Sequence, residues 1–574
     1  MAKGTRRSGK IINKLRSATS KAASFSRQHV QENLIDRVGS VANAKLAVFE
    51  WILLAVAILL FAVVQSFFYA NSLSSTVFVS GGTYVEGTIG RINSMNPLYA
   101  TTSSEKTVAK LLFSSLIFHD TSGNVGLRLA RSITSEDAKT WTVTMREGLS
   151  WSDGAPITAT DVAVTFKYIQ DDNAKTAFTG MFPGVLLEQI SDTELTFTLS
   201  TPFAGFPAAL DFPVIPAHII GETKSDALYE HEFSQNPICS GPFILNSIQS
   251  STAGAEQKLL LDRNPHTIET PMLSHIAIHT YSETSALLRA IDFLDISATA
   301  DLAQGENPSN PNIYTRETAI NRGYFLFLNT ESALMKQLPL RQALSSALDR
   351  DALRSQLGAS YGLDYPIQSS RLDLTFPTPF EYDIEKADKL VDGLKITDWD
   401  ALPPIRIATL NVSPYIDIAD ITKSTLESLG FRVDVHASDA QNLILNYILP
   451  REYDILVYDI DLGLDPDQFA YYHSASIGGS GLNFSNWRDV LVDDALLTAR
   501  GTLDEKLRVI KYNLFLQRWA AEVPSIPLFK STLTYHYSRI VRPFSENITL
   551  VAPLDRFIDV PYWATAKDSR LRTP

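Results

Sequence analysis

The residue patterns that serve hydrolysis, phosphoryl transfer or metal binding are incomplete in this sequence. His231-Glu232 lacks the second histidine of a zinc-binding HExxH motif. His275 and His279 lie in a stretch that reads as a strand, where residues four apart are separated by roughly 13 Å. Residues 478–481 (GGSG) do not match the GxSxG nucleophile elbow, and the sequence contains no GxxxxGK[ST] phosphate loop. We therefore expect no catalytic residue, no cofactor and no bound metal, and a hydrolase is only an alternative.

The charges are divided between a basic beginning and an acidic remainder. Residues 1–50 carry ten Lys/Arg and three Asp/Glu, whereas the other residues carry 40 and 60, a net charge of −20. Because nucleic-acid phosphates require a positive surface, this balance argues against nucleic acid as a partner. Cys239 is the only cysteine, which excludes an internal disulfide and a CxxC metal site. It also excludes a lipid-modified N-terminus, which would need a cysteine just after the apolar segment described next.

A long apolar segment follows the basic beginning. Residues 46–64 read LAVFEWILLAVAILLFAVV, and three aromatic residues follow within residues 65–69. A bilayer core requires about 20 apolar residues in a helix, whereas a cleaved signal peptide, the alternative, has an apolar core of about 7–15. Ten Lys/Arg precede the segment and none follows before Arg91, so the positive-inside rule places the N-terminus in the cytoplasm. The sequence thus predicts a cytoplasmic tail over 1–45, a transmembrane helix over 46–70, a linker over 71–82 and a large extracytoplasmic domain.

Strand and helix patterns are mixed through the rest of the chain. Residues 405–410 and 431–435 are strand-like, and residues 418–429 between them have a helical pattern. A strand, a helix and a strand in this order predict a parallel pair in an α/β fold. Apolar residues at helical spacing predict helices over 340–357 and 505–522. Further strands are expected at 141–146, 195–199 and 453–460.

Several short motifs occur in a fixed order along the chain. The most specific is residues 145–162, MREGLSWSDGAPITATDV, and residues 340–350 read LRQALSSALDR. Shorter motifs are GTYVEG at 82–87, ICSGPF at 238–243 and DIEKA at 383–387. Together these motifs resemble the family 5 extracellular solute-binding proteins, the peptide-binding subunits of ABC importers. The resemblance covers residues 82–530, and Cys239 stands where glycine is usual in that family.

The resemblance implies a two-lobed, periplasmic-binding-protein-like α/β fold with an extra subdomain, preceded by one transmembrane helix. The ligand of such a fold lies in the crevice between the lobes. The expected boundaries are a first lobe over 83–325 with the inserted subdomain at about 128–239, a second lobe over 326–525, and a return to the first lobe over 526–574.

The resemblance also implies which residues contact the ligand. In peptide-binding members, an aspartate after a strand of the second lobe holds the α-amino group of the peptide, and here the strand at 453–460 is followed by DLGLDPD. A desolvated carboxylate pairs well with an ammonium, so Asp461 is the first candidate and Asp465 the second. The alternative is that Asp465-Pro466-Asp467 only forms a turn, and the tryptophan that many members place beside the aspartate is missing. Further candidates, each of which can equally serve the core, are Tyr84, Glu86, Asn96, Tyr324, Phe327, Tyr471 and Tyr472.

The sequence therefore predicts a binding protein rather than an enzyme. We expect it to capture a peptide, or another small solute, by lobe closure and to deliver it to the permease subunits of an ABC importer in the cell membrane. A tethered sensor that signals to a membrane partner would need the same cleft and is the alternative from another class.

Overall fold

The computed structural model describes residues 45–120, 124–251, 256–303, 305–368, 372–545 and 548–571 of the chain. The chain forms two compact units, one made of Met1–Val77 with Asp568–Pro574 and the other of Phe78–Lys567. The expected cytoplasmic tail lies outside the described residues, except for Lys45. The expected boundaries of the lobes and of the inserted subdomain stay predictions.

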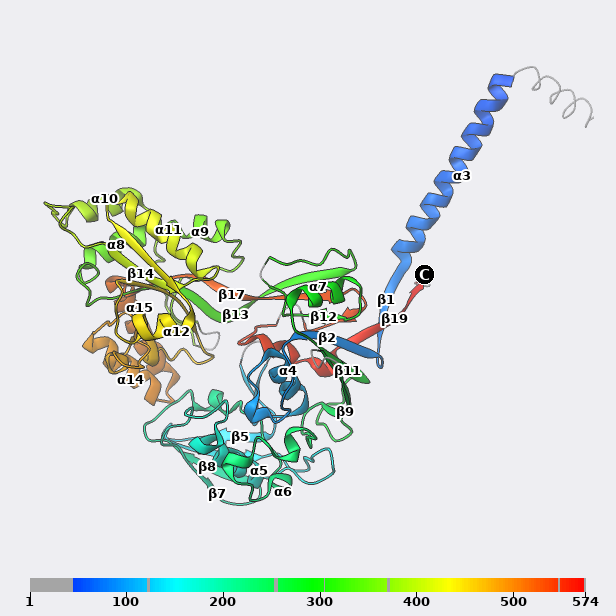
Figure 1. Ribbon diagram of the computed structural model, residues 1–574, viewed down its shortest axis with the longest axis horizontal. Helices are drawn as coiled ribbons and strands as arrows, with labels where there is room; N and C mark the ends of the chain where they lie inside the picture. Colours follow the sequence, from blue (N-terminus) through cyan, green and yellow to red (C-terminus); the bar gives the residue numbers. More distant parts are fainter. Residues whose placement is uncertain are drawn as a thin grey trace, which may run out of the picture. The chain divides into compact units, whose positions relative to one another are not determined.

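The first unit contains α3, a continuous helix of 29 residues, Lys45–Leu73 (Figure 1). The large apolar side chains from Phe49 to Val64 are exposed, and Trp51 has 72% of its surface accessible. Within the described residues, no helix is both long and apolar enough to cross a membrane. The helix is followed by β1, Ser74–Val79.

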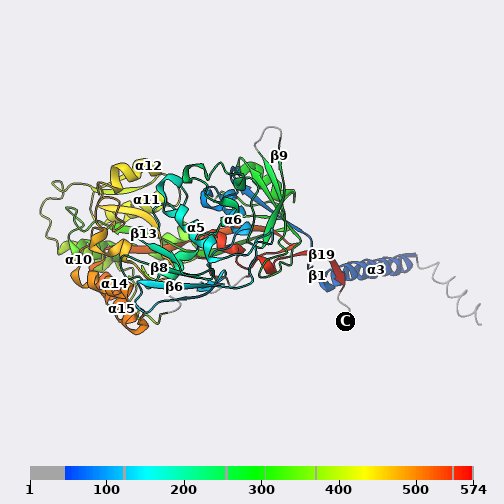
Figure 2. The same ribbon diagram turned by 90° about the horizontal axis from the view of Figure 1, so that it is seen from below.

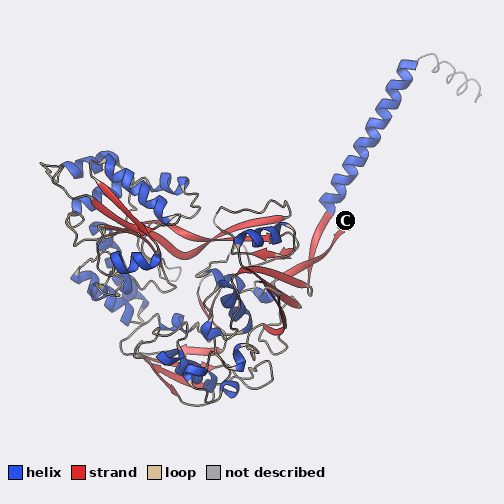
Figure 3. Ribbon diagram, in the orientation of Figure 1, coloured by secondary structure: helices blue, strands red, loops and turns tan. Residues whose placement is uncertain are grey.

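A ten-stranded sheet is the framework of the second unit, and the strands are red in Figure 3. The order across the sheet is β15-β14-β16-β13-β17-β12-β2-β11-β10-β9. The bounds of these strands are β2 Thr83–Ile89, β9 Phe243–Ser250, β10 Gln257–Arg263, β11 His275–Tyr281, β12 Ala298–Thr299, β13 Ile313–Leu328, β14 Ile405–Leu410, β15 Val433–Ser438, β16 Ile455–Asp461 and β17 Ser525–Ser538.

Two long strands, β13 and β17, connect the two sides of this sheet (Figure 1). They have 16 and 14 residues and pair antiparallel with each other. β13 also pairs with β16, and β17 also pairs with β12. The pairing register of β13 and β17 shifts between Ala319 and Gly323. We call β14–β16 with their helices the β16 side. The β2 side comprises β2 and β9–β12 with their helices, together with the residues from Val541 on that pack in the same core cluster as β2.

The β16 side contains the predicted strand-helix-strand unit. β14 and β15 are parallel, and α11, Tyr415–Ser428, connects them. α15, Glu505–Glu522, has the predicted bounds. It begins after Asp504, whose carboxylate accepts hydrogen bonds from backbone N–H groups of the first turn. Other helices of this side are α10, Ile384–Asp392, and α14, Val490–Gly501.

The single helix predicted over 340–357 is wrong, because the structure has two helices there. They are α8, Leu338–Ala347, and α9, Arg350–Gln356. Leu348 between them is extended, and the Asp349 carboxylate accepts a 2.9 Å hydrogen bond from a backbone N–H of α9. Since a carboxylate that caps a helix start stabilises an interruption, the apolar periodicity alone could not reveal the break.

On the β2 side, parallel strands lie between two helices. β2 runs parallel to β11 and β12. α4, Ser103–Leu112, begins with a capping box between Thr102 and Glu105 and packs in the same core cluster as Tyr84. α7, Thr284–Asp292, packs in a separate cluster, against the alternate residues of β2.

A separate four-stranded sheet has the order β5-β6-β8-β7 and falls within residues expected for the inserted subdomain (Figure 2). Its strands and its helix are β5 Ala130–Thr134, β6 Thr140–Met145, β7 Leu186–Gln189, β8 Glu194–Thr198 and α5 Ala159–Gln170. The remaining α-helices and strands are β3 Ile117–His119, β4 Val125–Leu127, α6 Ala217–Ile220, α12 Ala440–Leu443, α13 Phe469–Tyr472, β18 Val541–Arg542 and β19 Ala564–Leu571.

Candidate ligand-binding cleft

A cavity of about 770 Å³ lies along β13 and β17, where the β2 side and the β16 side meet. Tyr324 and Lys530 line it from these two strands, Asp301 and Arg556 line it from the β2 side, and Pro414 lines it from the β16 side. Small-molecule sites typically enclose about 300–1,000 Å³, so the cavity has room for a ligand of that size. Of the nine residues predicted to contact the ligand, only Tyr324 is among its lining residues.

Two of the predicted contacts, Tyr84 and Glu86, are fully buried behind the cavity wall. The Tyr84 hydroxyl donates to the Glu86 carboxylate and is in hydrogen-bond contact with the Tyr535 hydroxyl. Arg556, which lines the cavity, pairs with Glu86 Oε1 at 2.9 Å. Burial raises the pKa of Glu86, and the charge of Arg556 opposes that rise. Tyr84 and Glu86 therefore fix the position of Arg556.

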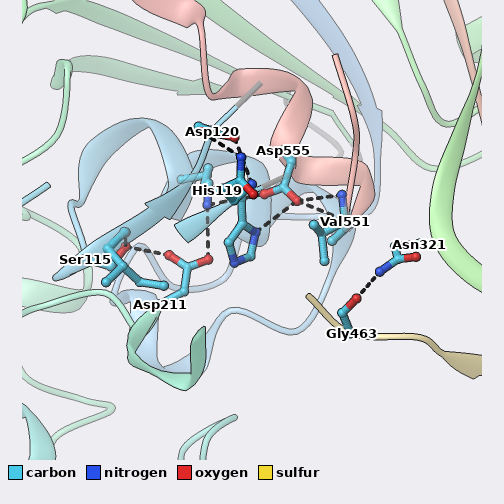
Figure 4. A network of polar contacts seen from close by, with 12 residues as sticks. Ser115, His119, Asp120, Asp211, Asn321, Gly463, Val551 and Asp555 are labelled. Carbon is cyan, nitrogen blue, oxygen red and sulfur yellow. Dashed lines mark hydrogen bonds and ion pairs between the residues drawn. The ribbon is translucent and has the colours of Figure 1, made fainter. Parts of the chain in front are cut away.

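The segment that carries Arg556 is held by a second polar network, around Asp555 (Figure 4). His119 Nδ1 lies 3.3 Å from this carboxylate and Lys110 Nζ lies 3.8 Å from it. Two preceding backbone N–H groups donate to it at 3.2 and 2.8 Å. Burial disfavours the charged carboxylate, but these hydrogen bonds and the Lys110 charge lower the pKa of Asp555 overall.

Several of the predicted residues lie near Arg322, at the end of β16. Its Nε donates to the buried Asp459 carboxylate, and its Nη1 lies 3.9 Å from Asp461. The Asp461 side chain is 73% exposed, so its carboxylate is accessible to solvent. Burial raises the pKa of Tyr471 to about 12, and the charge of Asp461 adds to that rise. Tyr324 lies next to the same cluster, because the centre of its ring is 5.2 Å from the ring centre of Tyr415.

The other aspartates of the acidic loop already have partners in the protein. Arg508 forms an ion pair with Asp465, and Arg500 lies 3.1 Å from Asp467. Their carboxylates are 18% and 11% exposed. These contacts favour Asp461 over Asp465 as a group that can receive a ligand cation.

Asn321 ties the same loop to a segment of the β2 side (Figure 4). Its side-chain amide donates to the Gly463 carbonyl, and its own carbonyl accepts a 2.9 Å hydrogen bond from the Leu462 N–H. Its N–H donates to the Leu550 carbonyl at 3.0 Å. The acidic loop is therefore anchored at the point where the β13–β17 register shifts.

Three further predicted contacts lie inside the protein. Asn96 is buried and caps a short helix by accepting a hydrogen bond from the Leu98 N–H. Phe327 and Tyr472 are in the core of the β16 side, and the Tyr472 hydroxyl lies 2.7 Å from Ser525 Oγ. In this structure none of the three lines the cavity along β13 and β17.

The prediction from the sequence missed Arg322, Lys530 and Arg556. The only local signal in the sequence that could have indicated Arg322 is its position directly before a strand-like stretch. Its pairing with Asp461, 139 positions later, comes from the antiparallel register of β13 and β16.

Among the described residues, no group of three or more His, Cys, Asp or Glu could hold a metal ion.

Comparisons with known proteins support the resemblance. Residues 124–520 match the model of the bacterial extracellular solute-binding proteins, family 5 Middle. The oligopeptide-binding protein AppA of Bacillus subtilis (strain 168) is 27% identical over 471 residues, which cover 77% of this chain and 85% of AppA. The probable D,D-dipeptide-binding periplasmic protein DdpA of Escherichia coli K12 is 24% identical over 479 residues, covering 79% and 89% of the two chains.

Solved structures share the two-lobed α/β fold. The structure of AppA from Bacillus subtilis in complex with a nonapeptide has a TM-score of 0.63 at 24% identity, covering 86% of this chain and all of that one. The transporter substrate-binding protein CtaP of Listeria monocytogenes has a TM-score of 0.70 at 24% identity, covering 85% of this chain and all of CtaP. With the family model matching more than half of its length, this chain belongs to the family 5 bacterial extracellular solute-binding proteins.

Proposed function

We propose that this protein captures peptides in the cleft along β13 and β17 and delivers them to the permease of an ABC importer. The observation that carries the proposal is a cavity of ligand size where the two sides of the sheet meet, in a chain of the solute-binding family. The names of AppA and DdpA, an oligopeptide-binding and a probable dipeptide-binding protein, point to peptides as the ligand class. No catalytic step is part of this function.

Asp461 is proposed to receive the α-amino group of the peptide. It is supported by the exposure of its carboxylate and by the distance of 3.9 Å to its nearest cation, Arg322. Tyr324 and Tyr471 are proposed to contact the peptide beside it. Asp465 is the second candidate, and it would have to exchange its ion pair with Arg508 for the ligand. Of the remaining predicted residues, Tyr84, Glu86, Asn96, Phe327 and Tyr472 are proposed to support the cleft from the core.

Closure is proposed to bend β13 and β17. These two strands pair with each other, β13 pairs with β16 of one side, and β17 pairs with β12 of the other, so together they join the two sides of the main sheet. The proposed lobes are 83–325, with an insertion at about 128–239, and 326–525, with 526–574 returning to the first. Hinge closure around a ligand is a common way for such two-lobed proteins to commit a bound ligand to transport.

A membrane anchor is proposed from the sequence, although none of the described helices is both long and apolar enough to cross a membrane. Residues 46–64 contain one charged residue. They lie within α3, a helix of 29 residues whose apolar side chains are exposed. Ten preceding cations favour a cytoplasmic N-terminus. Protease treatment of intact cells tests the orientation, because digestion of the large domain is expected and its full protection would contradict it.

The proposed function is tested by titrating purified protein, freed of retained ligand, with pools of short peptides. We expect binding, and we expect Asp461→Asn to weaken it about 10- to 100-fold, since a hydrogen bond to a charged group contributes about 1.5–3 kcal/mol. N-acetylation of the peptides should weaken binding to the wild type but not further weaken binding to the variant. Asp388→Asn, at an exposed carboxylate of α10, is the matched control. Absence of binding to every peptide pool would refute the proposed function.

A further inference from the structure

Lys530 lies in the middle of β17, on the wall of the proposed cleft. It pairs with Gly323 of β13 beside the register shift, and its backbone N–H donates to the Tyr361 carbonyl at 2.8 Å. The residue is only partly accessible to solvent. Its backbone is therefore fixed by two neighbouring segments, and the residue is part of the cavity wall.

The Lys530 ammonium has no anionic partner among the residues that the structure describes. No ion pair and no side-chain hydrogen bond of Lys530 occurs there, and burial alone lowers its pKa. A partly buried cation that loses water without gaining an acceptor raises the free energy of the folded state. A bound anion would remove that cost, so this position favours an anionic group in the ligand.

The acids that line the same cavity are already used by the protein. Asp301 accepts hydrogen bonds from two hydroxyls and one backbone N–H, at 2.6 to 2.9 Å. Glu306 accepts from the Ala303 N–H at 3.2 Å, and Glu317 accepts from a serine hydroxyl at 2.8 Å. Each of these carboxylates thus has a partner in the protein other than Lys530.

A second cation on the cavity wall also has an unused donor. The side chain of Arg556 is 3% exposed, and its Nε is buried without a hydrogen-bond partner within the described part of the chain. Its other guanidinium nitrogens donate to Glu86 and to a backbone carbonyl. Arg556 is neutralised by Glu86, and Lys106, the other lysine that lines the cavity, is exposed to solvent, whereas Lys530 is partly buried and has no carboxylate partner among the described residues.

We propose that Lys530 binds a carboxylate of the ligand and so selects peptides that present one in the cleft. This inference rests on the proposed function and adds to it a specificity-determining residue. The carboxylate has two sources in a peptide, the C-terminus and the side chain of Asp or Glu. Both give the same charge-assisted hydrogen bond to an ammonium, and the experiment separates them.

The test compares four pools of random tripeptides by calorimetry. The pools carry a free or an amidated C-terminus, each with either Glu or Gln at the middle position. Wild-type protein is expected to bind the charged member of at least one matched pair about 10- to 100-fold more tightly than the neutral member, as a charge-assisted hydrogen bond allows. Preference for the free C-terminus identifies one source, and preference for Glu identifies the other.

Lys530→Met should abolish that preference, and Lys530→Arg should retain most of it because it keeps the charge. Lys386→Met, at an exposed lysine of α10, is the control and should bind like the wild type. Equal binding of charged and neutral pools by the wild type, or an unchanged preference in Lys530→Met, overturns the role of Lys530 while leaving peptide capture intact. Failure of all four pools to bind overturns both.

Discussion

Arg322 on β13 and Asp459 on β16 form an ion pair across two paired strands. The Asp459 carboxylate is 5% exposed and also accepts a 2.6 Å hydrogen bond from the Tyr415 hydroxyl. Arg322 is 41% exposed, and its second nitrogen faces Asp461. One arginine therefore joins a buried structural carboxylate to the exposed carboxylate that we propose for the ligand.

Arg322→Met should destabilise the protein by about 1–3 kcal/mol, because it leaves a buried carboxylate without its cation. This range is below the about 3–5 kcal/mol of fully buried pairs, since solvent screens the half-exposed guanidinium. Urea unfolding of Arg322→Met, Asp459→Asn and the double variant measures the coupling. Arg488→Met removes an exposed pair with Glu331 and should cost less than about 0.5 kcal/mol. Equal losses in Arg322→Met and Arg488→Met would contradict the argument.

Asp555 should make stability depend on pH in the acid range. Its pKa in the folded protein is lowered, against the effect of burial, by hydrogen bonds and by Lys110. The stabilisation by its charged form is therefore present above its unfolded pKa of about 3.9 and is lost as the pH falls through the lower folded value. Asp555→Asn should be clearly less stable than the wild type at pH 7, and the difference should shrink toward pH 3. A difference that is constant with pH would show that the carboxylate charge is not responsible.

The fold could be predicted from the sequence mainly where a single stretch of neighbouring residues determines the local structure. The bounds of α15 follow from its apolar periodicity and from Asp504, and the parallel pair of β14 and β15 follows from the order of three neighbouring elements. The break between α8 and α9 depends on a local cap that competes with periodicity, and it was missed. Within the candidate site, Lys530 reaches its place only through the pairing of β17 with β13, which a single segment does not reveal.

The thiol of Cys239 should be unreactive in the folded protein. It is completely buried, and burial raises the pKa of the thiol to about 12, so the reactive thiolate is scarce at neutral pH. We expect less than one-tenth of the protein to react with a thiol reagent at pH 8 under conditions in which urea-unfolded protein reacts completely. Rapid modification of the native protein would contradict the buried position of this residue.

The contact between the 203–205 segment and Arg500 should hold the cleft closed. The Ala204 N–H donates to the Arg500 carbonyl at 2.7 Å, and the Arg500 guanidinium lies 4.5 Å from the Phe203 ring centre. The same guanidinium lies 4.8 Å from the ring centre of Phe469 and pairs with Asp467. Phe203→Ala removes one cation–π contact and leaves the ion pair with Asp467 in place.

A cation–π contact of about 1 kcal/mol in a closed, ligand-bound form corresponds to a change of roughly fivefold in affinity. Phe203→Ala should therefore raise the Kd for a bound peptide roughly fivefold, chiefly through faster dissociation, because the contact is broken when the cleft opens. Surface plasmon resonance measures both rates. Phe293→Ala, at a phenylalanine that is 76% exposed, is the matched control and should leave both rates unchanged. A dissociation rate that is equal in Phe203→Ala and the wild type would show that this contact does not distinguish the bound form from the open one.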